Sequence, residues 1–563
     1  MRKVGAENRI FTLWDFAVCF FLAIRFSASS FYIETGYCAF TWSFAALTAM
    51  HFCFFLLLDY AGKRLLYRYA RREDRGLPGR GLSGKYGALL EGPRGLLFTW
   101  AVLFLCWLPT LVVLYPGTLI NDTWGQLSFY NRFLEGHPLQ DNSPALLTLI
   151  YGFVLNGLQR ATGSWHAAFF IFVICQGMLT SLAFASAVSY AYRKLRIGAG
   201  AAFGMLLIYG LLPVFPASVQ TIAKDAFSAW IFVFFTLIFL EIARTRGEAL
   251  KERRTLISLT LTGLFCALTR KVNIPVILFS VICLPLVYPA FRKRMILPIA
   301  IIGGITVVGF QVMYHTGILG QAGKQELLPI PYQQTARFVK EHPEEVTEEE
   351  YDLLDRVLGM EDLAKRYSPV SADPVKGYGE RATTTEYIGY AKTWVAQGLR
   401  HPLTYVEAFD AMLSGWFSWH EYIPLMDMTD WHSQLDRSLI PEEAAERTWS
   451  AEAAKTYQTA YEDLYRSPIA RFFLSYGFFA AILPAFIFCV LMRKKTKEKT
   501  RLWAAMIPLL LSLLFGCFLA PVSISMEGRR YLYQIIYTEP VLLAFCIHQA
   551  RMDPGREAAP CGE

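Results

Sequence analysis

The sequence predicts an all-α membrane protein: a polytopic bundle of about 12 spanning helices, with juxtamembrane surface helices and a mainly helical external insert. Three observations predict this class. The chain of 563 residues is 54% hydrophobic and 15% aromatic, which is an apolar content above that of ordinary soluble domains. Its charged residues make up 18% of the sequence and gather between apolar runs. Those runs approach the length of about 20 residues that a helix needs to cross a bilayer.

The apolar runs give the predicted spans in chain order. They lie at 10–28, 40–58, 97–114, 165–191, 199–215, 226–243, 255–269, 273–290, 295–313, 468–491, 502–520 and 532–549. Arg2, Lys3 and Arg9 precede the first run, and a second run follows soon after it. We therefore interpret the first run as an uncleaved span and not as a removable signal peptide.

The run 144–158, PALLTLIYGFVLNGL, is apolar but short, and the basic loops decide whether it crosses the membrane. Cytosolic loops of membrane proteins carry an excess of Lys and Arg. Basic clusters are present at 63–80, 193–196, 251–254, 291–294 and 493–501. All of them fall on one side if 144–158 lies along the outer surface, whereas all but the first fall outside if it crosses. We therefore predict a cell-membrane protein with both termini cytosolic and its active face external.

This topology divides the chain into four regions. They are an N-terminal pair of spans with a basic cytosolic loop (1–96), a transmembrane core (97–313) with a first external loop (115–164), an external domain (314–467), and three C-terminal spans with a short cytosolic tail (468–563). The external domain has 14 basic and 26 acidic residues, a net charge of −12. Amphipathic patterns predict helices there at 342–358, 385–399 and 402–419.

Two kinds of site are not expected. The basic residues form short clusters beside spans and no continuous groove, which argues against a nucleic-acid partner. Most of the cysteines lie inside apolar runs, and none lies in 314–467. The cysteine pattern therefore predicts neither a disulfide framework nor a zinc site.

Polar residues recur at the predicted external ends of the spans, where candidate substrate-binding groups gather. These groups are Asn121, Asp122, Gln126, His137 and Asp141 in the first loop, and Lys224, Asp225, Arg270, Lys271, Arg529, Arg530 and Tyr531 in later connections. Basic residues outside run against the positive-inside tendency. Binding of an anion explains them, and phosphate is favoured because a guanidinium group matches it with two hydrogen bonds. The alternative is that each one extends toward lipid headgroups.

One carboxylate beside several cations suits sugar transfer from a lipid-linked phosphate. Because a phosphate leaving group already carries negative charge, cations stabilise its departure without a protonating acid. A carboxylate is then needed as the general base that takes a proton from the acceptor hydroxyl. Asp122 is the candidate for this catalytic role, and a single displacement would invert the anomeric centre. The alternative for Asp122 is a helix cap for 123–134.

The order of these parts resembles the GT-C superfamily of membrane glycosyltransferases. The similar parts are Asp122 just beyond a span, His137–Pro138, the 144–158 surface helix, the span 165–191 followed by RKLR, and RRYLYQIIYTEP at 529–540. The resemblance covers most of 97–313 and 468–549, and within the superfamily it is greatest to bacterial multi-pass proteins of unassigned function. It implies a polyprenyl-phosphate sugar donor, a glycan, lipid or protein acceptor, and a lipid bilayer around the protein.

The chain departs from that superfamily in its first loop. Many members have paired acids there, whereas this chain has Asn121–Asp122, so a metal role is open. A second carboxylate, from Asp141 or Asp225, would be needed to hold a divalent cation such as Mg²⁺ or Mn²⁺. The His-Pro element is also separated from the surface helix by LQDNS.

Two other functions stay open at this point. The main alternative is a polytopic transporter or flippase for lipid-linked sugars or polymers. Transporters tend to show inverted repeats and charges near mid-membrane, whereas here the spans are mostly free of charge and Asp15 and Arg25 are the exceptions. The third function is a surface scaffold or sensor that uses 314–467 to bind cell-wall material without chemistry.

Overall fold

The structure is a computed structural model of the chain. It describes all residues except 1–10, 36, 39–40, 75–80, 322, 324–327, 377–381, 426–443, 445, 494–495, 520–527 and 553–563. The described part is all-α apart from two pairings of two-residue strands. The predicted fold class is therefore confirmed at the level of a helical bundle.

Seven stretches in the described part are long and apolar enough to cross a membrane. Six of them lie in α1 (Leu13–Thr35), α2 (Trp42–Asp74), α4 (Gly95–Val113), α7 (Trp165–Arg193), α10 (Lys224–Arg244) and α24 (Thr496–Leu519). The seventh is one continuous helix made of η2 (Pro289–Phe291), α13 (Arg292–Gly303), η3 (Gly304–Gly309) and α14 (Phe310–His315). Apolar surface on such helices is stable only in lipid or against another helix. The chain is therefore a multi-pass membrane protein.

The predicted count of twelve spans is not confirmed, because several predicted runs form shorter helices. The apolar helices of this kind are α8 (Ala199–Leu211), α12 (Asn273–Val287), and η10 (Phe478–Ile482) continued by α23 (Leu483–Met492). α11 (Arg253–Thr269) and α25 (Tyr533–Arg551) fill the two remaining runs. In α8 the helix stops because Leu212 takes an extended conformation before Pro213, as expected for a residue that precedes proline.

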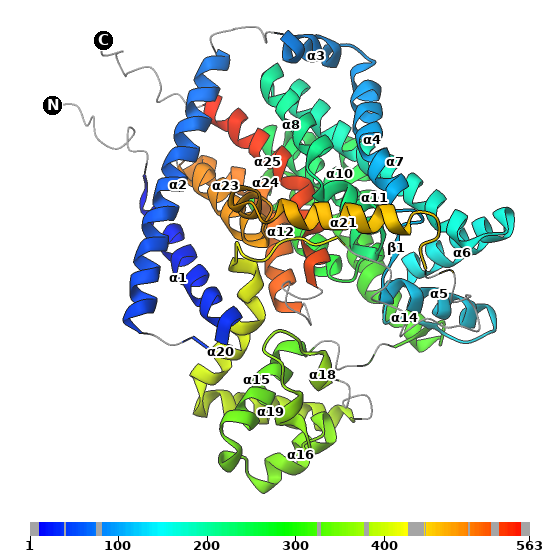
Figure 1. The fold of residues 1–563 in the computed structure, drawn as a ribbon, viewed down its shortest axis with the longest axis vertical. Helices are drawn as coiled ribbons and strands as arrows, with labels where there is room; N and C mark the ends of the chain where they lie inside the picture. Colours follow the sequence, from blue (N-terminus) through cyan, green and yellow to red (C-terminus); the bar gives the residue numbers. More distant parts are fainter. Residues whose placement is uncertain are drawn as a thin grey trace.

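α10 lies at the centre of the bundle and packs against α7, α11, α24 and α25 (Figure 1). Its aromatic side chains Phe232, Phe235 and Phe239 are fully buried, as is Ile536 on α25. α1 and α2 pack against each other at one side, and α2 also contacts α25. This central packing brings the first turns of α10 and α25 to the same end of the bundle.

Two parallel pairings of short strands lie at that end. β1 (Thr118–Leu119) pairs with β3 (Thr221–Ile222), and β2 (Leu139–Gln140) pairs with β4 (Leu319–Gly320). β1 leads into α5 (Asn121–Leu134), and β2 leads toward α6 (Ala145–Thr162). α6 corresponds to the predicted surface helix at 144–158. It packs on α5 and α7 and is not one of the seven long apolar helices.

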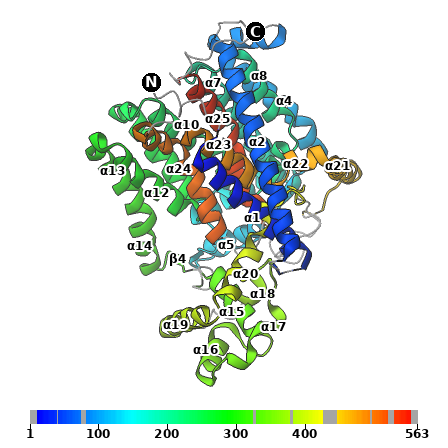
Figure 2. The same cartoon turned by 90° about the vertical axis from the view of Figure 1, so that its left-hand side faces the viewer.

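Helices of the predicted external segment form a lobe, which we define as residues 329–400 (Figures 1 and 2). It holds α15 (Pro329–Glu341), η5 (Pro343–Glu345), α16 (Glu348–Leu358), α17 (Leu363–Arg366), α18 (Asp373–Lys376) and α19 (Thr384–Arg400). Its own apolar core includes Tyr332, Leu354 and Tyr390. Thr347 and Thr383 each cap a helix through a capping box, which satisfies backbone donors at the helix start.

The chain returns from the lobe to the bundle through α20 (Pro402–Leu413) and η7 (Ser414–Phe417), which pack on α1. α21 (Ala451–Leu464) then lies across the bundle (Figure 1), beside α4. Before it, Ser450 and Arg447 donate hydrogen bonds to the carbonyl of Tyr115. The predicted external segment 314–467 thus consists of a protruding lobe and a second part held against the bundle.

The remaining short elements connect these parts. They are α3 (Gly81–Glu91), α9 (Val214–Val219), η1 (Glu248–Lys251), α22 (Pro468–Phe473) and η11 (Gly528–Leu532). α3 lies at the end of the bundle opposite the lobe (Figure 1). There Arg193 donates to the carbonyl of Leu90 at 2.8 Å, and Arg551 donates to the carbonyl of Arg196. Basic residues from the ends of α7 and α25 thus lie at this end of the bundle.

Candidate functional site

The pairing of β1 with β3 decides where α5 and α10 begin. Each strand is followed by one connecting residue and then by the first residue of its helix. Because the strands are parallel, both helices begin at the same edge of the pairing. The Thr123 hydroxyl donates to the carbonyl of Ile222 at 2.6 Å and joins the two helix starts. Asp122 and Lys224 therefore lie side by side, although they are far apart in the sequence.

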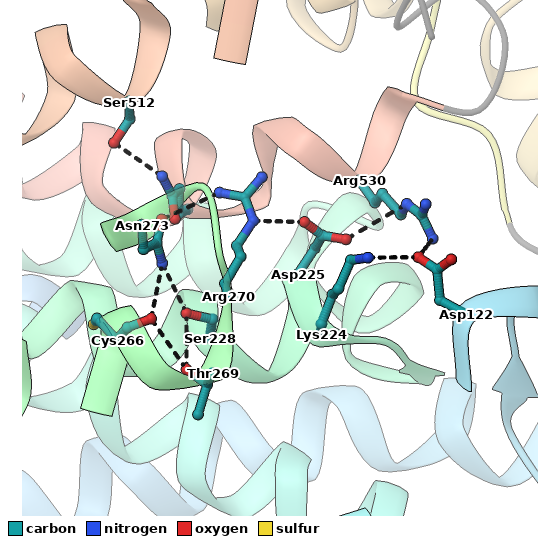
Figure 3. Close-up of polar contacts among 11 residues, drawn as sticks. Asp122, Lys224, Asp225, Ser228, Cys266, Thr269, Arg270, Asn273, Ser512 and Arg530 are labelled. Atoms are coloured by element: carbon teal, nitrogen blue, oxygen red, sulfur yellow. Dashed lines mark hydrogen bonds and ion pairs between the residues drawn. The ribbon is translucent and has the colours of Figure 1, made fainter. Parts of the chain in front are cut away.

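The Asp122 carboxylate lies between two cations (Figure 3). Its Oδ2 is 2.9 Å from Nζ of Lys224 and 2.9 Å from a terminal guanidinium nitrogen of Arg530. The side chains of Asp122, Lys224 and Arg530 are 30%, 21% and 14% exposed. The three side chains are therefore partly exposed at this end of the bundle, whereas the Asp122 oxygen that makes both contacts is itself buried.

Arg530 also joins this pair to a deeper one. Its Nε is 3.4 Å from Oδ2 of Asp225, and Asp225 accepts a hydrogen bond of 2.6 Å from Nε of Arg270. The side chains of Arg270 and Asp225 are 4% and 1% exposed. We call Asp122, Lys224, Asp225, Arg270 and Arg530 the outer cluster. Its three cations and two carboxylates leave one positive charge in excess, which favours an anion as ligand.

Neutral polar groups hold Arg270 in place (Figure 3). Asn273, at the start of α12, lies 3.4 Å from a guanidinium nitrogen of Arg270 through Oδ1 and donates to Ser228 Oγ at 2.9 Å. The Thr269 hydroxyl lies 3.3 Å from the same Ser228 oxygen. Because these residues come from α10, α11 and α12, three helices fix the guanidinium of Arg270.

Tyr531 lies against both guanidinium groups. The guanidinium carbons of Arg270 and Arg530 are 6.0 and 5.7 Å from the centre of its ring, within the range of a cation–π interaction. Burial raises the pKa of the Tyr531 hydroxyl above its ordinary value, so the ring contributes its face and a neutral hydroxyl group at neutral pH.

The surrounding charges set the protonation state of Asp122. Burial raises the pKa of its carboxyl, but the charges of Arg530 and Lys224 outweigh this effect and hold the pKa well below its ordinary value. The charge of Lys376, in α18 of the lobe, acts in the same direction. Asp122 is therefore ionised at neutral pH and is a weak base while both cations are paired with it.

Asp141 forms an ion pair with Lys271. Its Oδ2 is 2.7 Å from Nζ of Lys271, and the hydroxyl of Tyr314 donates to the same oxygen. The backbone N–H of Asp141 donates to the carbonyl of Gly320 at 3.0 Å. This pair therefore connects the first loop and α14 at the point where the chain leaves for the lobe.

The divalent cation considered from the sequence does not fit these carboxylates. Asp122, Asp141 and Asp225 each face a Lys or Arg side chain within ion-pair distance. Two groups of three possible metal ligands occur in the described part of the chain, and neither includes any of these three residues.

Four other predicted site residues lie outside the ion pairs. Gln126 is fully buried and donates to Thr148 on α6 at 3.1 Å, which holds α5 against α6. Asn121 is half-buried in the first turn of α5, and His137 is exposed on the turn after α5. The side chain of Arg529 lies outside the described residues.

A second ionic cluster lies inside α1 and α2, and we call it the inner triad. Lys63 contacts Asp15, and it lies 2.8 Å from Asp59 one helical turn away. The side chains of Lys63 and Asp15 are fully buried, and that of Asp59 is 8% exposed. Asp59 also borders an open apolar pocket of about 400 Å³ that residues of α1, α2, η10, α23 and α25 line.

Sequence reasoning missed two contributors to these clusters. Lys376 acts on Asp122 from the lobe, and no pattern in its segment SADPVK marks it as a site residue. Lys63 was counted only as part of a basic loop, although its spacing of four residues from Asp59 is the signal for an ion pair on one helix face.

The fold and the outer cluster define a class: a multi-pass helical membrane protein with an ion-paired polar site where several helices begin. A family model described as a family of unknown function, DUF6020, matches residues 136–559. This match covers more than half of the chain, so the protein belongs to that family. The matched range includes Lys224, Asp225, Arg270 and Arg530, and it begins after Asp122. No curated protein and no solved structure gives a significant match to the chain.

Proposed function

We propose that the protein is a membrane glycosyltransferase that moves a sugar from a polyprenyl-phosphate donor to a glycan, lipid or protein acceptor. One observation carries the proposal: Asp122 lies 2.9 Å from both Lys224 and Arg530. A candidate base and two candidate phosphate ligands are thus within reach of one substrate. The resemblance to GT-C glycosyltransferases in the sequence supports the same reaction.

The charges of the outer cluster suit a phosphate leaving group. Arg530 and Lys224 are partly exposed, and Arg270 backs them with a charge that α10, α11 and α12 hold in place. Cations stabilise the negative charge that develops on the departing lipid phosphate when the bond to the anomeric carbon breaks. The electron pair of that bond leaves with the phosphate oxygen, so no acid has to donate a proton.

Donor binding would also prepare Asp122 for its role as base. A bound phosphate would draw Arg530 and Lys224 toward its own oxygens and weaken their pairing with Asp122. The pKa of the Asp122 carboxyl, which these two charges hold low, would then rise toward its ordinary value. Asp122 could take the proton of the acceptor hydroxyl as that oxygen attacks the anomeric carbon from the opposite face.

The proposed orientation puts the outer cluster and the lobe outside the cell and both termini in the cytosol. Two observations support it. Basic residues at the ends of α7 and α25, namely Arg193, Arg196 and Arg551, lie at the end of the bundle that carries α3, as expected of a cytosolic end. The lobe, which belongs to the acidic segment 314–467, lies at the opposite end of the bundle from α3 (Figure 1).

The test is a transfer assay with the full-length protein in proteoliposomes. A polyprenyl-phosphate-linked sugar is supplied with a cell-envelope extract as acceptor, and labelled sugar is followed from the lipid into the acceptor fraction. We expect transfer that increases with the amount of protein, and accumulation of the lipid-linked donor in cells that lack the protein. Labelled donor that stays intact in both experiments would overturn the proposal.

The inner triad favours the second candidate, a transporter or flippase for lipid-linked sugars. Charges fully buried between spanning helices often lie on ion or proton pathways, and here Asp59 also borders a pocket. In proteoliposomes without any acceptor, a transporter would move labelled donor between leaflets, whereas a transferase would leave it in place.

A further inference from the structure

Two His-Pro steps meet in the lobe and bring two imidazole rings together. α15 ends in His342–Pro343, and α19 ends in His401–Pro402. The backbone angles of the two histidines are nearly the same, with φ −132° and ψ 52° at His342 and φ −129° and ψ 69° at His401. Their rings stack with centres 3.7 Å apart. Two imidazole rings that follow separate helices are thus in contact.

A carboxylate completes the group. Both oxygens of Glu345, at the end of η5, lie 2.9 Å from Nε2 of His401. One ligand atom each from His342, Glu345 and His401 lies within 4.8 Å of the other two. The side chains of His401 and Glu345 are 26% and 40% exposed, so an ion in solution can reach the group.

Surrounding hydrogen bonds orient His342. The Thr404 hydroxyl donates its proton to Glu341 at 3.1 Å, so its oxygen can only accept from Nε2–H of His342, which is 3.2 Å away. In this tautomer the lone pair of His342 is on Nδ1. A fixed tautomer of this kind is typical of histidines that bind metal ions.

The guanidinium group of the neighbouring Arg400 has its own partners. Arg400 donates to the backbone carbonyl of Glu345 at 2.9 Å and pairs with the carboxylate of Glu350 at 2.6 Å. Its ion-pair partner is thus Glu350. This differs from the outer cluster, where Lys and Arg side chains face the carboxylate oxygens directly.

We propose that His342, Glu345 and His401 bind a Zn²⁺ ion. Two imidazoles and one carboxylate are ligands that zinc prefers, whereas Mg²⁺ and Ca²⁺ prefer oxygen ligands. The ion would lie between these three side chains, join the ends of α15 and α19 to η5, and keep one tetrahedral position for water. The cysteine pattern did not predict this zinc site, because cysteine positions give no information about a site whose ligands are two histidines and a glutamate.

The test is zinc binding by the purified full-length protein after treatment with a chelator. We expect one Zn²⁺ per chain in this site, detected by titration against a chromogenic chelator. His342→Ala and His401→Ala should each remove that equivalent, whereas His315→Ala, an exposed histidine at the end of α14, should keep it. Glu345→Gln should weaken binding by about tenfold or more. Unchanged zinc content in His401→Ala, or no binding by the unmodified chain, would overturn the proposal.

A spectroscopic test covers the case in which the alanine variants do not fold. Co²⁺ replaces Zn²⁺ in most sites of this kind, and its d–d absorption becomes intense when nitrogen ligands hold it in tetrahedral geometry. We expect that absorption in the unmodified protein and in His315→Ala. The weak spectrum of hydrated Co²⁺ in the unmodified protein would overturn the proposal without any variant in the lobe.

Discussion

The outer cluster and the inner triad both join aspartates to basic side chains but carry opposite charge imbalances. The outer cluster has three cations and two carboxylates, whereas the inner triad has one cation, Lys63, between two carboxylates. The outer cluster is partly exposed at the end of the bundle, and the triad is buried between α1 and α2. The comparison teaches that an ion pair within an apolar bundle does not by itself indicate a substrate site. Exposure and the sign of the excess charge distinguish the two clusters.

Loss of the Asp122 carboxylate should have the largest effect on activity. If Asp122 is the general base, Asp122→Asn should lower sugar transfer by about 10²–10⁴-fold at an equal protein level. Asp463→Asn, on an exposed ion pair of α21, is the matched control and should leave transfer unchanged. Transfer by Asp122→Asn within twofold of the unmodified protein would remove Asp122 from the mechanism.

Loss of Lys63 should instead affect stability. Lys63→Ala leaves Asp15 and Asp59 buried without a cation, and the free energy of unfolding should fall by about 3–5 kcal/mol. Thermal unfolding in detergent measures this change. A triple variant with Lys63→Met, Asp15→Asn and Asp59→Asn should recover most of the loss, because no uncompensated charge remains. If the triple variant is stable but does not function, the triad has a role beyond packing and the transporter proposal gains support.

Arg530→Gln tests the excess positive charge of the outer cluster. The variant removes one charged hydrogen-bond donor, and such a bond contributes about 1.5–3 kcal/mol. We expect KM for the lipid-phosphate donor to rise by roughly tenfold to a hundredfold, with a smaller change in thermal stability than for Lys63→Ala. An unchanged KM would show that the phosphate is not bound by this guanidinium.

The ion pairs of Asp122 should make stability depend on pH only in acid. The pKa of this carboxyl is lower in the folded protein than in the unfolded chain. Its contribution is therefore complete above the unfolded value of about 3.9 and is lost as the pH falls toward the folded pKa. The difference in Tm between the unmodified protein and Asp122→Asn should be constant near neutral pH and should shrink below about pH 4. A difference that shrinks between pH 8 and 6 would contradict this assignment.

Lys376→Ala should have the smallest effect. Lys376 acts on Asp122 through its charge and pairs with Asp373 at 2.8 Å, and partly exposed charges contribute at most about 1 kcal/mol. We expect a change in transfer of less than about fivefold, with a pH profile displaced from that of the unmodified protein. Lys365→Ala, in the neighbouring α17, should leave the profile in place.

Apolar runs and loop charges were sufficient to predict the helical membrane class. Each predicted run contains a helix, but run length alone could not show that α8 ends before Pro213 or that α11 starts with charged residues. The sequence also could not show that 314–467 divides into the lobe and the part near α21. That division depends on contacts such as the one between Arg447 and Tyr115, which join residues far apart in the chain.

The same limit applies to the candidate site. Residue type and position singled out Lys224, Arg270 and Arg530 as cations at predicted external ends, and Asp122 as a carboxylate just beyond a span. Their pairing could not be predicted, since it depends on packing between α5, α10, α12 and η11. His137 was included because a His-Pro step was similar to a superfamily element, yet its side chain is exposed. The two His-Pro steps that do converge lie in the lobe.

The strand pairing ahead of α5 and α10 makes the length of two connectors critical. Each connector is one residue, Ile120 or Ala223, and the two pack on each other in the interior. One inserted residue would turn the following helix by about 100° relative to its strand and rotate Asp122 or Lys224 away from its partner. An insertion or deletion at either joint should therefore separate Asp122 from Lys224 and break their ion pair.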